Sequence, residues 1–354
     1  MRRMQIVCFP KMKGVSTMKE SFGITPEGKQ AFLYTLRCGQ MSACISDYGA
    51  TLVRLLVPDA RGDRADVVLG YDDVSGYAGG QAFLGATVGR CANRIGKASF
   101  VLGRRTYSMT ANEGKNNLHS GPDYYHNRLW QVAQISENAI TLRLDSPDGD
   151  QGFPGNAHIQ VCYTLEPSSV LRIRYEAVCD KDTVFNLTNH SYFNLAGHDH
   201  PERAMEQILI LPARSFTPAD GESIPTGEVR PVEGTPMDFR TPKAIGRDLT
   251  ADYEPLKLQG GYDHNFEVFS DPCAVLTDPV SGRSLAISTD CPGLQFYAGN
   301  NLAERGKNGV FYGKNSGVAL ETQFYPDALH HPQWKQPITP AGVRYCSETR
   351  YRFR

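Results

Sequence analysis

The strongest constraint on the fold is a strict alternation of apolar and polar residues with a period of two. Ile159 and Val161 alternate with polar neighbours within residues 158–165, and the pattern returns in residues 171–177 and 140–144. A period of two puts successive side chains on opposite faces of a strand, so these segments predict half-buried strands. Turn signals such as Asp-Gly, Pro-Gly and Ser-Gly separate them, and helical periodicity over more than two turns is hard to find. The sequence therefore predicts an all-β fold, a large antiparallel β-sandwich with few short helices.

The chain shows no boundary between domains. Its 34 glycines and 22 prolines are spread along all 354 residues rather than pooled in a linker. Because all-β folds of this size often remain one unit, residues 22–354 are expected to form a single domain. Residues 1–21 show no clear periodicity and are expected to be an N-terminal extension, either disordered or an early translation start, with Met18 as the alternative start.

Composition excludes several classes of function. The 37 Lys and Arg balance 38 Asp and Glu, which provides no basic field for nucleic acid and favours a neutral small-molecule partner. Nine cysteines without a Cys-x-x-Cys pair argue against a disulfide framework and a structural zinc site, and indicate a reducing compartment, the cytoplasm. No segment is long enough to span a membrane. The phosphate-binding loop, the dinucleotide glycine fingerprint, the Gly-x-Ser-x-Gly elbow and His-Glu-x-x-His are all missing, which disfavours nucleotide, nicotinamide, serine-hydrolase and zinc-protease chemistry.

Several polar segments carry more functional side chains than ordinary strands or turns require. Taken one at a time they are weak signals, but together they indicate a polar site. They are residues 89–95 (GRCANRI), 116–119 (NNLH), 186–195 (NLTNHSYFNL), 261–266 (GYDHNF), 292–297 (PGLQFY) and 320–323 (LETQ).

These segments resemble the galactose mutarotase (aldose 1-epimerase) family. The segments 92–95 (ANRI) and 188–195 (TNHSYFNL) are the most specific, and residues 320–323 fix the register near the C-terminus. The resemblance begins near Phe22 and covers nearly all of the chain after the extension. It implies a β-sandwich with an open cleft, no metal and no cofactor, and an enzyme that interconverts the α and β anomers of free hexoses such as galactose and glucose.

Anomerisation needs two groups, a base that removes the proton of the C1 hydroxyl and an acid that protonates the ring oxygen. The resemblance assigns the base to Glu321 and the acid to His190. It leaves two roles open for His119, as a donor to the ring oxygen or as a support for His190. Partial burial among polar neighbours would raise the pKa of Glu321 towards neutrality.

A sugar rich in hydroxyls also needs a donor fork and an acceptor. Arg94 and Asp263 fit these roles, and Asn93 and Gln295 are expected to complete the hydroxyl contacts. Four aromatic side chains beside the motifs are candidates to stack on the sugar, although most of them could be core: Tyr192, Phe193, Phe296 and Tyr297. His264 is interpreted as structural. Two histidine pairs without a third ligand are expected in surface loops rather than at a metal: His198 with His200, and His330 with His331.

Other functions stay open at this stage. The same sandwich could be a non-catalytic sugar-binding domain, and a glycoside hydrolase or polysaccharide lyase would need a second carboxylate, for which Asp263 is the candidate. A mutarotase for a phosphorylated hexose also stays open, because Arg90, Arg94 and Arg128 lie near the motifs. Ser120 and residues 124–128 depart from the family pattern beside the cleft, which leaves the preferred sugar open. The sequence allows a monomer or a homodimer.

Overall fold

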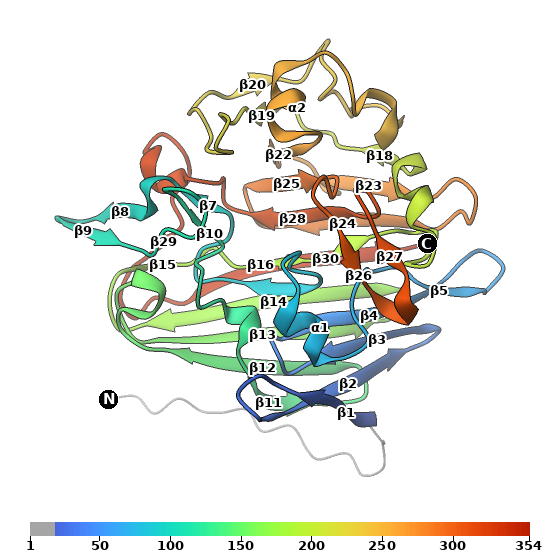
Figure 1. Cartoon of the computed structure of the whole chain (residues 1–354), viewed down its shortest axis with the longest axis horizontal. Helices are drawn as coiled ribbons and strands as arrows, with labels where there is room; N and C mark the ends of the chain where they lie inside the picture. Colours follow the sequence, from blue (N-terminus) through green and yellow to red (C-terminus); the bar gives the residue numbers. More distant parts are fainter. Residues whose placement is uncertain (1–17) are drawn as a thin grey trace.

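The fold was examined in a computed structural model that describes residues 18–354, and it is built almost entirely of strands. The strands of each sheet pair antiparallel, and in Figure 1 they lie above one another from β11 and β12 at the bottom to β25 and β28 near the top. The largest sheet has nine strands, in the order β11 (Gln131–Ile135), β12 (Ala139–Ser146), β13 (Ala157–Glu166), β14 (Val170–Cys179), β30 (Tyr345–Phe353), β24 (Ser284–Thr289), β23 (Ala274–Thr277), β18 (Ile208–Ile210) and β21 (Lys243–Ala244).

A second sheet of six strands carries much of the polar site. Its order is β17 (Tyr192–Phe193), β28 (Val318–Gln323), β25 (Gly293–Tyr297), β22 (Asp263–Glu267), β19 (Ser215–Thr217) and β20 (Arg230–Pro231). A third sheet has five strands in chain order, β1 (Met18–Ile24), β2 (Gln30–Cys38), β3 (Met41–Ser46), β4 (Thr51–Pro58) and β5 (Arg64–Asp66).

Five two-stranded pairs complete the strands. They join β6 (Ala86–Val88) with β16 (Thr188–His190), β7 (Arg94–Ile95) with β10 (Asn117–Leu118), β8 (Ser99–Leu102) with β9 (Arg105–Ser108), β15 (Thr183–Val184) with β29 (Ile338–Thr339), and β26 (Glu304–Arg305) with β27 (Phe311–Tyr312).

Helices are short in the described part of the chain. The α-helices are α1 (Val74–Gly79), capped by the side chain of Asp73, and α2 (Glu254–Gln259); single 3-10 turns lie at Gly96–Ala98, Tyr125–Asn127, Asp150–Gly152, Pro201–Glu206, Ile245–Asp248, Lys307–Gly309 and Ala328–His330. No helix within residues 18–354 is long and apolar enough to cross a membrane.

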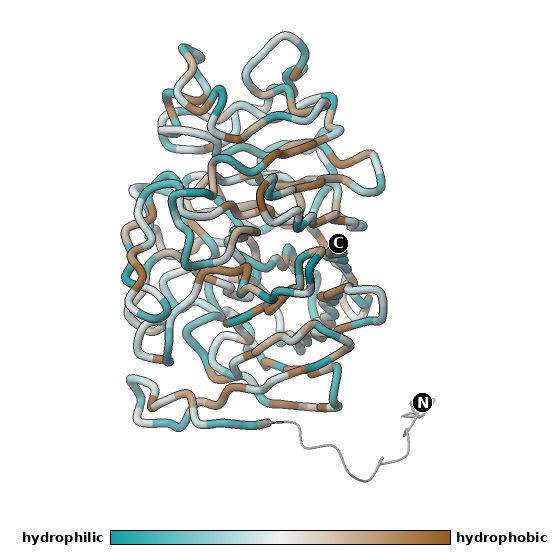
Figure 2. Tube along the Cα trace, turned by 90° about the vertical axis from the view of Figure 1, so that its right-hand side faces the viewer, coloured by the Kyte–Doolittle hydropathy of each residue, from teal (hydrophilic) through white to brown (hydrophobic). Residues whose placement is uncertain are grey.

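The alternation in the sequence becomes the two faces of the strands. In β13 the side chains of Ile159, Val161 and Tyr163 are buried, whereas those of His158 and Gln160 are exposed. Figure 2 shows the same mixture of hydrophobic and hydrophilic residues along the trace. One large apolar core contains side chains from the nine-stranded and the six-stranded sheets together. The predicted all-β fold with few short helices is therefore confirmed.

The N-terminal boundary differs from the sequence expectation. Residues 18–21, which we assigned to the extension, belong to β1, where Lys19 pairs with Tyr34 and Ser21 with Phe32. An edge strand needs only a backbone partner, so a weak side-chain pattern does not exclude it. Residues 1–17 lie outside the described part of the chain.

Candidate active site

The pleat of three neighbouring strands separates core side chains from polar ones. On β28 Leu320 joins the apolar core while Glu321 points to the opposite face, and on β25 Leu294 and Phe296 enter the core while Gln295 does not. Gln295 lies directly opposite Glu321 in the strand pairing. Because side chains alternate along a strand, the same pleat that builds the core also gathers the polar groups on one face.

Asp263 at the start of β22 is fixed by its neighbours. Gln295 Nε2 donates a hydrogen bond of 2.6 Å to Asp263 Oδ1, and Arg94 Nη1 lies 4.0 Å from Asp263 Oδ2. Gln295 does not line the cavity described below. Its amide oxygen, Oε1, has no hydrogen-bond partner within the described chain, and its predicted contact with sugar hydroxyls stays a prediction.

His190 reaches the same face from β16. Its Nε2 lies 3.5 Å from Glu321 Oε1, and both side chains are almost fully buried. Two polar atoms of this pair, His190 Nδ1 and Glu321 Oε2, have no hydrogen-bond partner within the described chain. Buried polar atoms without partners are costly, so these two are available for an incoming ligand.

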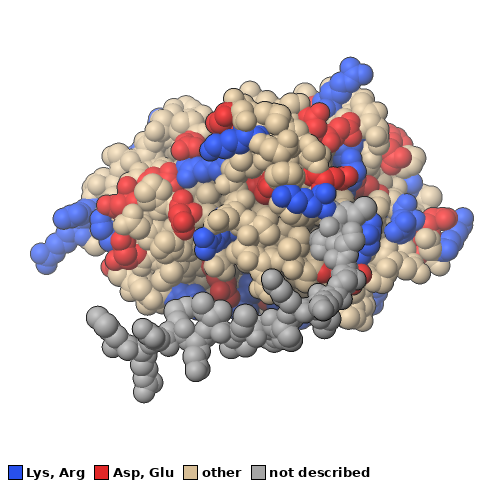
Figure 3. Space-filling model, turned by 90° about the horizontal axis from the view of Figure 1, so that it is seen from below, with Lys and Arg blue, Asp and Glu red and all other residues tan. Residues whose placement is uncertain are grey.

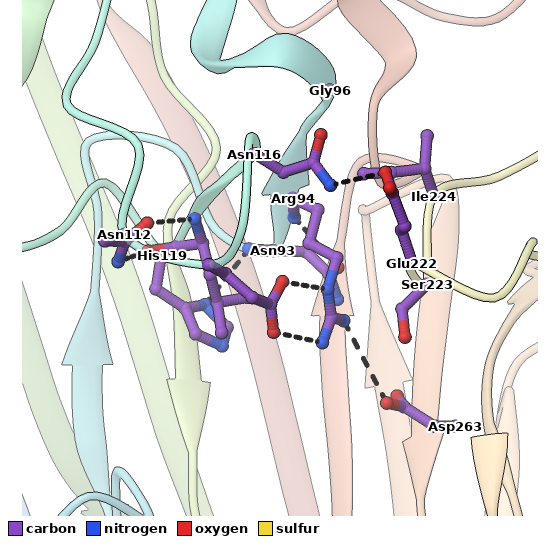
Figure 4. Close-up of polar contacts among 12 residues, drawn as sticks. Asn93, Arg94, Gly96, Asn112, Asn116, His119, Glu222, Ser223, Ile224 and Asp263 are labelled. Atoms are coloured by element: carbon purple, nitrogen blue, oxygen red, sulfur yellow. Dashed lines mark hydrogen bonds and ion pairs between the residues drawn. The ribbon is translucent and has the colours of Figure 1, made fainter.

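The antiparallel pair of β7 and β10 brings Asn93, Arg94 and His119 to the site (Figure 4). The backbone N–H of Asn93 donates to His119 Nδ1 at 3.1 Å, and the N–H of His119 donates to the carbonyl of Asn93 at 3.0 Å. Since Nδ1 accepts, the neutral imidazole of His119 carries its proton on Nε2. His119 is therefore a fixed hydrogen-bond donor.

Together these groups line a cavity of about 550 Å³. Six of the seven residues predicted from the sequence line it: Asn93, Arg94, His119, His190, Asp263 and Glu321. Tyr192 and Tyr297 also line the cavity, whereas Phe193 and Phe296 belong to the core. A cavity of this size, polar at its floor, accommodates a monosaccharide.

Burial moves the proton affinities of the acid–base pair in opposite directions. Burial raises the pKa of Glu321 well above its usual value, an effect to which the charge of Asp263 adds and which that of Arg94 opposes. Burial lowers the pKa of His190 to about 4, and it lowers that of His119 well below its usual value. Burial thus disfavours the charged form of each partner, the carboxylate of Glu321 and the imidazolium of His190.

Three of these groups also form a possible ligand set for a metal ion. The ligating atoms of His119, His190 and Glu321 lie within 4.8 Å of one another. Two imidazoles and a carboxylate are a ligand set that zinc uses in catalytic sites. The expectation that the enzyme needs neither metal nor cofactor remains a prediction.

The cavity residues that the sequence analysis missed include Phe83 and Glu113. Phe83 follows the turn after α1 with a positive φ of 56°, and its ring centroid lies 4.7 Å from that of His119 and 5.7 Å from that of His190. Glu113 forms a two-point ion pair with Arg94. No motif surrounds Phe83, so the sequence carries no signal for it. Glu113 lies only three residues before the polar segment 116–119, and a charged residue at that position could have been named as a site candidate.

The histidines outside the site take structural positions. His264 is buried and its Nδ1 accepts from the N–H of Asp263, which fits its structural interpretation. His198 is buried against Tyr312, with 2.9 Å between Nδ1 and the hydroxyl oxygen, so the prediction of a surface loop was wrong for this residue. Tyr312 comes from a hairpin more than 100 residues away, a contact that local sequence does not reveal.

The departures from the family pattern are also explained by contacts. Ser120 is buried, and its hydroxyl donates to the carbonyl of Cys91 and accepts from the Cys91 N–H. Tyr124 and His126 pack their rings against Phe83, at 5.3 and 4.9 Å between centroids. The variable residues thus support one wall of the cavity through Phe83.

A buried carboxylate–imidazole pair at the floor of a polar cavity on a β-sandwich defines an enzyme that acts on carbohydrates by acid–base chemistry. Comparison with known proteins agrees. Residues 33–352 match the family model described as aldose 1-epimerase. Galactose mutarotase of Mus musculus is 39% identical over 346 residues, covering 96% of this chain and 99% of the relative. Aldose 1-epimerase of Haemophilus influenzae is 40% identical over 337 residues, covering 93% and 97%.

Solved structures show the same fold. An aldose epimerase homologue from C. elegans superposes with a TM-score of 0.84 at 31% identity, covering 92% of this chain and 99% of that one. Galactose 1-epimerase from Lactobacillus acidophilus also gives a TM-score of 0.84, at 28% identity, covering 96% and 99%. The chain belongs to the aldose 1-epimerase family, the carbohydrate isomerases that interconvert the anomers of free sugars.

Proposed function

We propose that the protein interconverts the α and β anomers of free hexoses, galactose and glucose among them, with Glu321 as general base and His190 as general acid. The observation that carries this proposal is the buried pair itself, with 3.5 Å between His190 Nε2 and Glu321 Oε1. Glu321 removes the proton of the C1 hydroxyl while His190 protonates the ring oxygen. The bond between C1 and the ring oxygen breaks, C1 becomes an aldehyde carbon, and rotation about the C1–C2 bond presents its other face for closure. Each proton returns when the ring closes, so the enzyme ends unchanged.

The opposite pKa shifts suit the proposed proton transfers. Burial raises the pKa of Glu321 and lowers that of His190 to about 4, so it disfavours the charged form of both groups. An ionised Glu321 therefore takes up the C1 hydroxyl proton readily, and a protonated His190 gives its proton readily to the ring oxygen. Because both anomers are substrates, the same two groups serve ring opening from either anomer.

The remaining cavity residues support binding and polarisation. His119 presents a fixed Nε2–H donor, which suits a hydrogen bond to the ring oxygen beside His190. Arg94 and Asp263 offer a donor fork and an acceptor to sugar hydroxyls, and Asn93, which precedes Arg94 in the chain, lines the same cavity. Tyr192 and Tyr297 offer apolar faces to the pyranose ring.

The arginines near the motifs favour a free sugar over a phosphorylated one. Arg90 is completely buried and donates to the carbonyls of Pro154 and Gly155. Arg128 pairs with Asp123 and Asp150. Arg94, which alone of the three lines the cavity, is paired with Glu113. No arginine of this group is left for a phosphate.

Polarimetry tests the proposal directly. Freshly dissolved α-D-galactose and α-D-glucose should reach their unchanged end points faster with the protein than without it. Sugar binding without acceleration would favour the non-catalytic alternative, and acceleration restricted to glucose 6-phosphate would favour the phosphorylated sugar. Prior treatment with a chelator should leave the rate unchanged, because the proposed steps use only side chains of this chain.

The cellular setting is a separate proposal, drawn from the cysteines and the surface charge. We propose a cytoplasmic protein, a monomer or homodimer, without nucleic-acid or membrane partners. The eight cysteines within residues 18–354 are free thiols, and acidic and basic side chains are interspersed on the face seen in Figure 3. Sedimentation analysis and cell fractionation test these points.

A further inference from the structure

Glu113 is the closest charged partner of the binding arginine. Its carboxylate meets Arg94 at two points, 2.6 Å between Oε2 and Nε and 2.9 Å between Oε1 and Nη2. Figure 4 shows the guanidinium of Arg94 facing Asp263, whose Oδ2 lies 4.0 Å from Nη1. A two-point pair of this kind fixes the guanidinium plane and uses its inner donors. Only the Nη1 end and one Nη2 proton stay free for a ligand.

The pair also decides the electrostatics of the cavity. Among the described residues that line it, Arg94 is the sole lysine or arginine, and the acidic side chains are Glu113, Asp263, Glu304 and Glu321. Glu113 neutralises the cation at short range, while the other three acids face the same space. A neutral sugar can still accept hydrogen bonds from Arg94, but a carboxylate or phosphate meets no unpaired cation there.

We propose that Glu113 is a specificity-determining residue that restricts the site to neutral aldoses by occupying the inner edge of Arg94. The inference rests on the proposed function, because it concerns which sugars the mutarotase site accepts. Without the Glu113 charge, Arg94 keeps only the longer ion pair with Asp263, at 4.0 Å, and its charge and its Nε and Nη2 donors become available to an anionic substituent. The chemical class gained would be uronic acids and sugar phosphates.

The test compares D-galactose with D-galacturonate, which differ only in the group at C6, in the wild-type enzyme and in Glu113→Gln. Glutamine keeps the shape of the side chain and removes its charge. The ratio of kcat/KM for galacturonate to that for galactose should rise by at least ~10-fold in Glu113→Gln, the scale expected for one charge near a partly shielded partner. A purely structural role would lower both activities together and leave this ratio unchanged.

Two control variants locate the effect. Glu222→Gln removes a charge that pairs with the exposed Lys115 outside the cavity, and should leave the ratio as in the wild type. Glu304→Gln removes a cavity charge without a contact to Arg94, and should raise the ratio less than Glu113→Gln does. An equal rise in Glu304→Gln would overturn the assignment to the Arg94 pair, because net charge alone would then suffice.

The ionic-strength dependence of kcat/KM and the binding affinities of the two sugars test the same inference independently. In the wild type, kcat/KM for galacturonate should increase with ionic strength as repulsion is screened, and this increase should shrink in Glu113→Gln. If the variant loses turnover, calorimetric affinities for the two sugars supply the same ratio. An unchanged ratio in Glu113→Gln refutes the inference while galactose mutarotation by the wild type stands, whereas a wild type inactive on galactose refutes the proposed function instead.

Discussion

Glu321 and His190 carry the proposed chemistry, and near-isosteric changes separate it from packing. Glu321→Gln and His190→Asn should each lower kcat by at least ~10²-fold while KM stays within an order of magnitude, because each variant keeps its polar contacts but cannot exchange a proton with the sugar. Stopped-flow polarimetry measures both constants. Since burial disfavours the charged carboxylate, Glu321→Gln should also melt no lower than the wild type. Full activity in Glu321→Gln would remove the base from the mechanism.

Arg94 should behave as a binding residue rather than a proton-transfer residue. Arg94→Ala removes the donors that face the cavity and leaves Glu113 without its partner, so KM for galactose should rise by at least ~10-fold. Arg94→Lys keeps the charge but loses the fork, and should fall between wild type and Arg94→Ala. Initial rates over a range of sugar concentrations measure KM for each variant. An unaltered KM in Arg94→Ala would contradict the proposed role of Arg94 in sugar binding.

At the scale of single elements, the sequence predicted what is local and missed what is not. The strand β13 was predicted because its burial pattern repeats within its own residues. The pairing of β22, β25 and β28 joins segments about 30 residues apart, and no periodicity specifies it. Asp263 and Glu321, which were named through the family motif, line the cavity, whereas the hydrogen bond from Gln295 to Asp263 was not expected from the sequence.

The backbone around His119 is another feature that local sequence does not specify. His119 and Ser120 adopt positive φ of 53° and 62°, an uncommon conformation for residues with a Cβ. The pairing of β10 with β7 and the hydrogen bond from Ser120 to Cys91 stabilise this conformation. A sequence shows the residues of such a turn but not the distant contacts that stabilise it.

Asp327 anchors the antiparallel pair of β7 and β10 to the segment after β28. The N–H of Gly96 donates to Asp327 Oδ1 at 2.8 Å, and the N–H of Asp327 donates to the carbonyl of Arg94 at 2.9 Å. Asp327→Ala removes a buried acceptor at a position with φ of 56°, so it should cost about 1–3 kcal/mol of stability and raise KM for galactose. Thermal unfolding and kinetics measure the two effects.

Asp327→Asn is the matched variant for this anchor. Asparagine keeps an oxygen acceptor for Gly96 and tolerates a positive φ, so this variant should stay near the wild type in both measurements. Equal damage in Asp327→Asn and Asp327→Ala would show that the charge, which also faces His330, matters more than the anchor.

At the scale of the whole molecule, buried histidines link stability to pH. Burial lowers the pKa of five of them, to about 3 for His126 and His264, to about 4 for His190, well below the usual value for His119, and below the usual value for His198. Below about pH 6.5 the unfolded chain protonates these side chains while the folded protein does not. The unfolded state then binds more protons, so the free energy of unfolding falls as pH falls from about 6.5 towards the folded values.

The expected slope is up to ~1.4 kcal/mol per pH unit for each histidine within that window. Glu321 offsets part of it, because burial raises its pKa and its contribution is lost as pH rises. Replacing one histidine isolates its contribution to the pH dependence of stability. His264→Asn keeps an acceptor for the Asp263 N–H. It should reduce the slope of the unfolding free energy against pH, between pH 6.5 and 5, by up to ~1.4 kcal/mol per pH unit, measured by urea unfolding. His158→Asn, a change at an exposed histidine, should leave the slope unchanged. Equal slopes in His264→Asn and wild type would mean that His264 is protonated in the folded protein, and the argument from burial would then fail for the histidines of the active site as well.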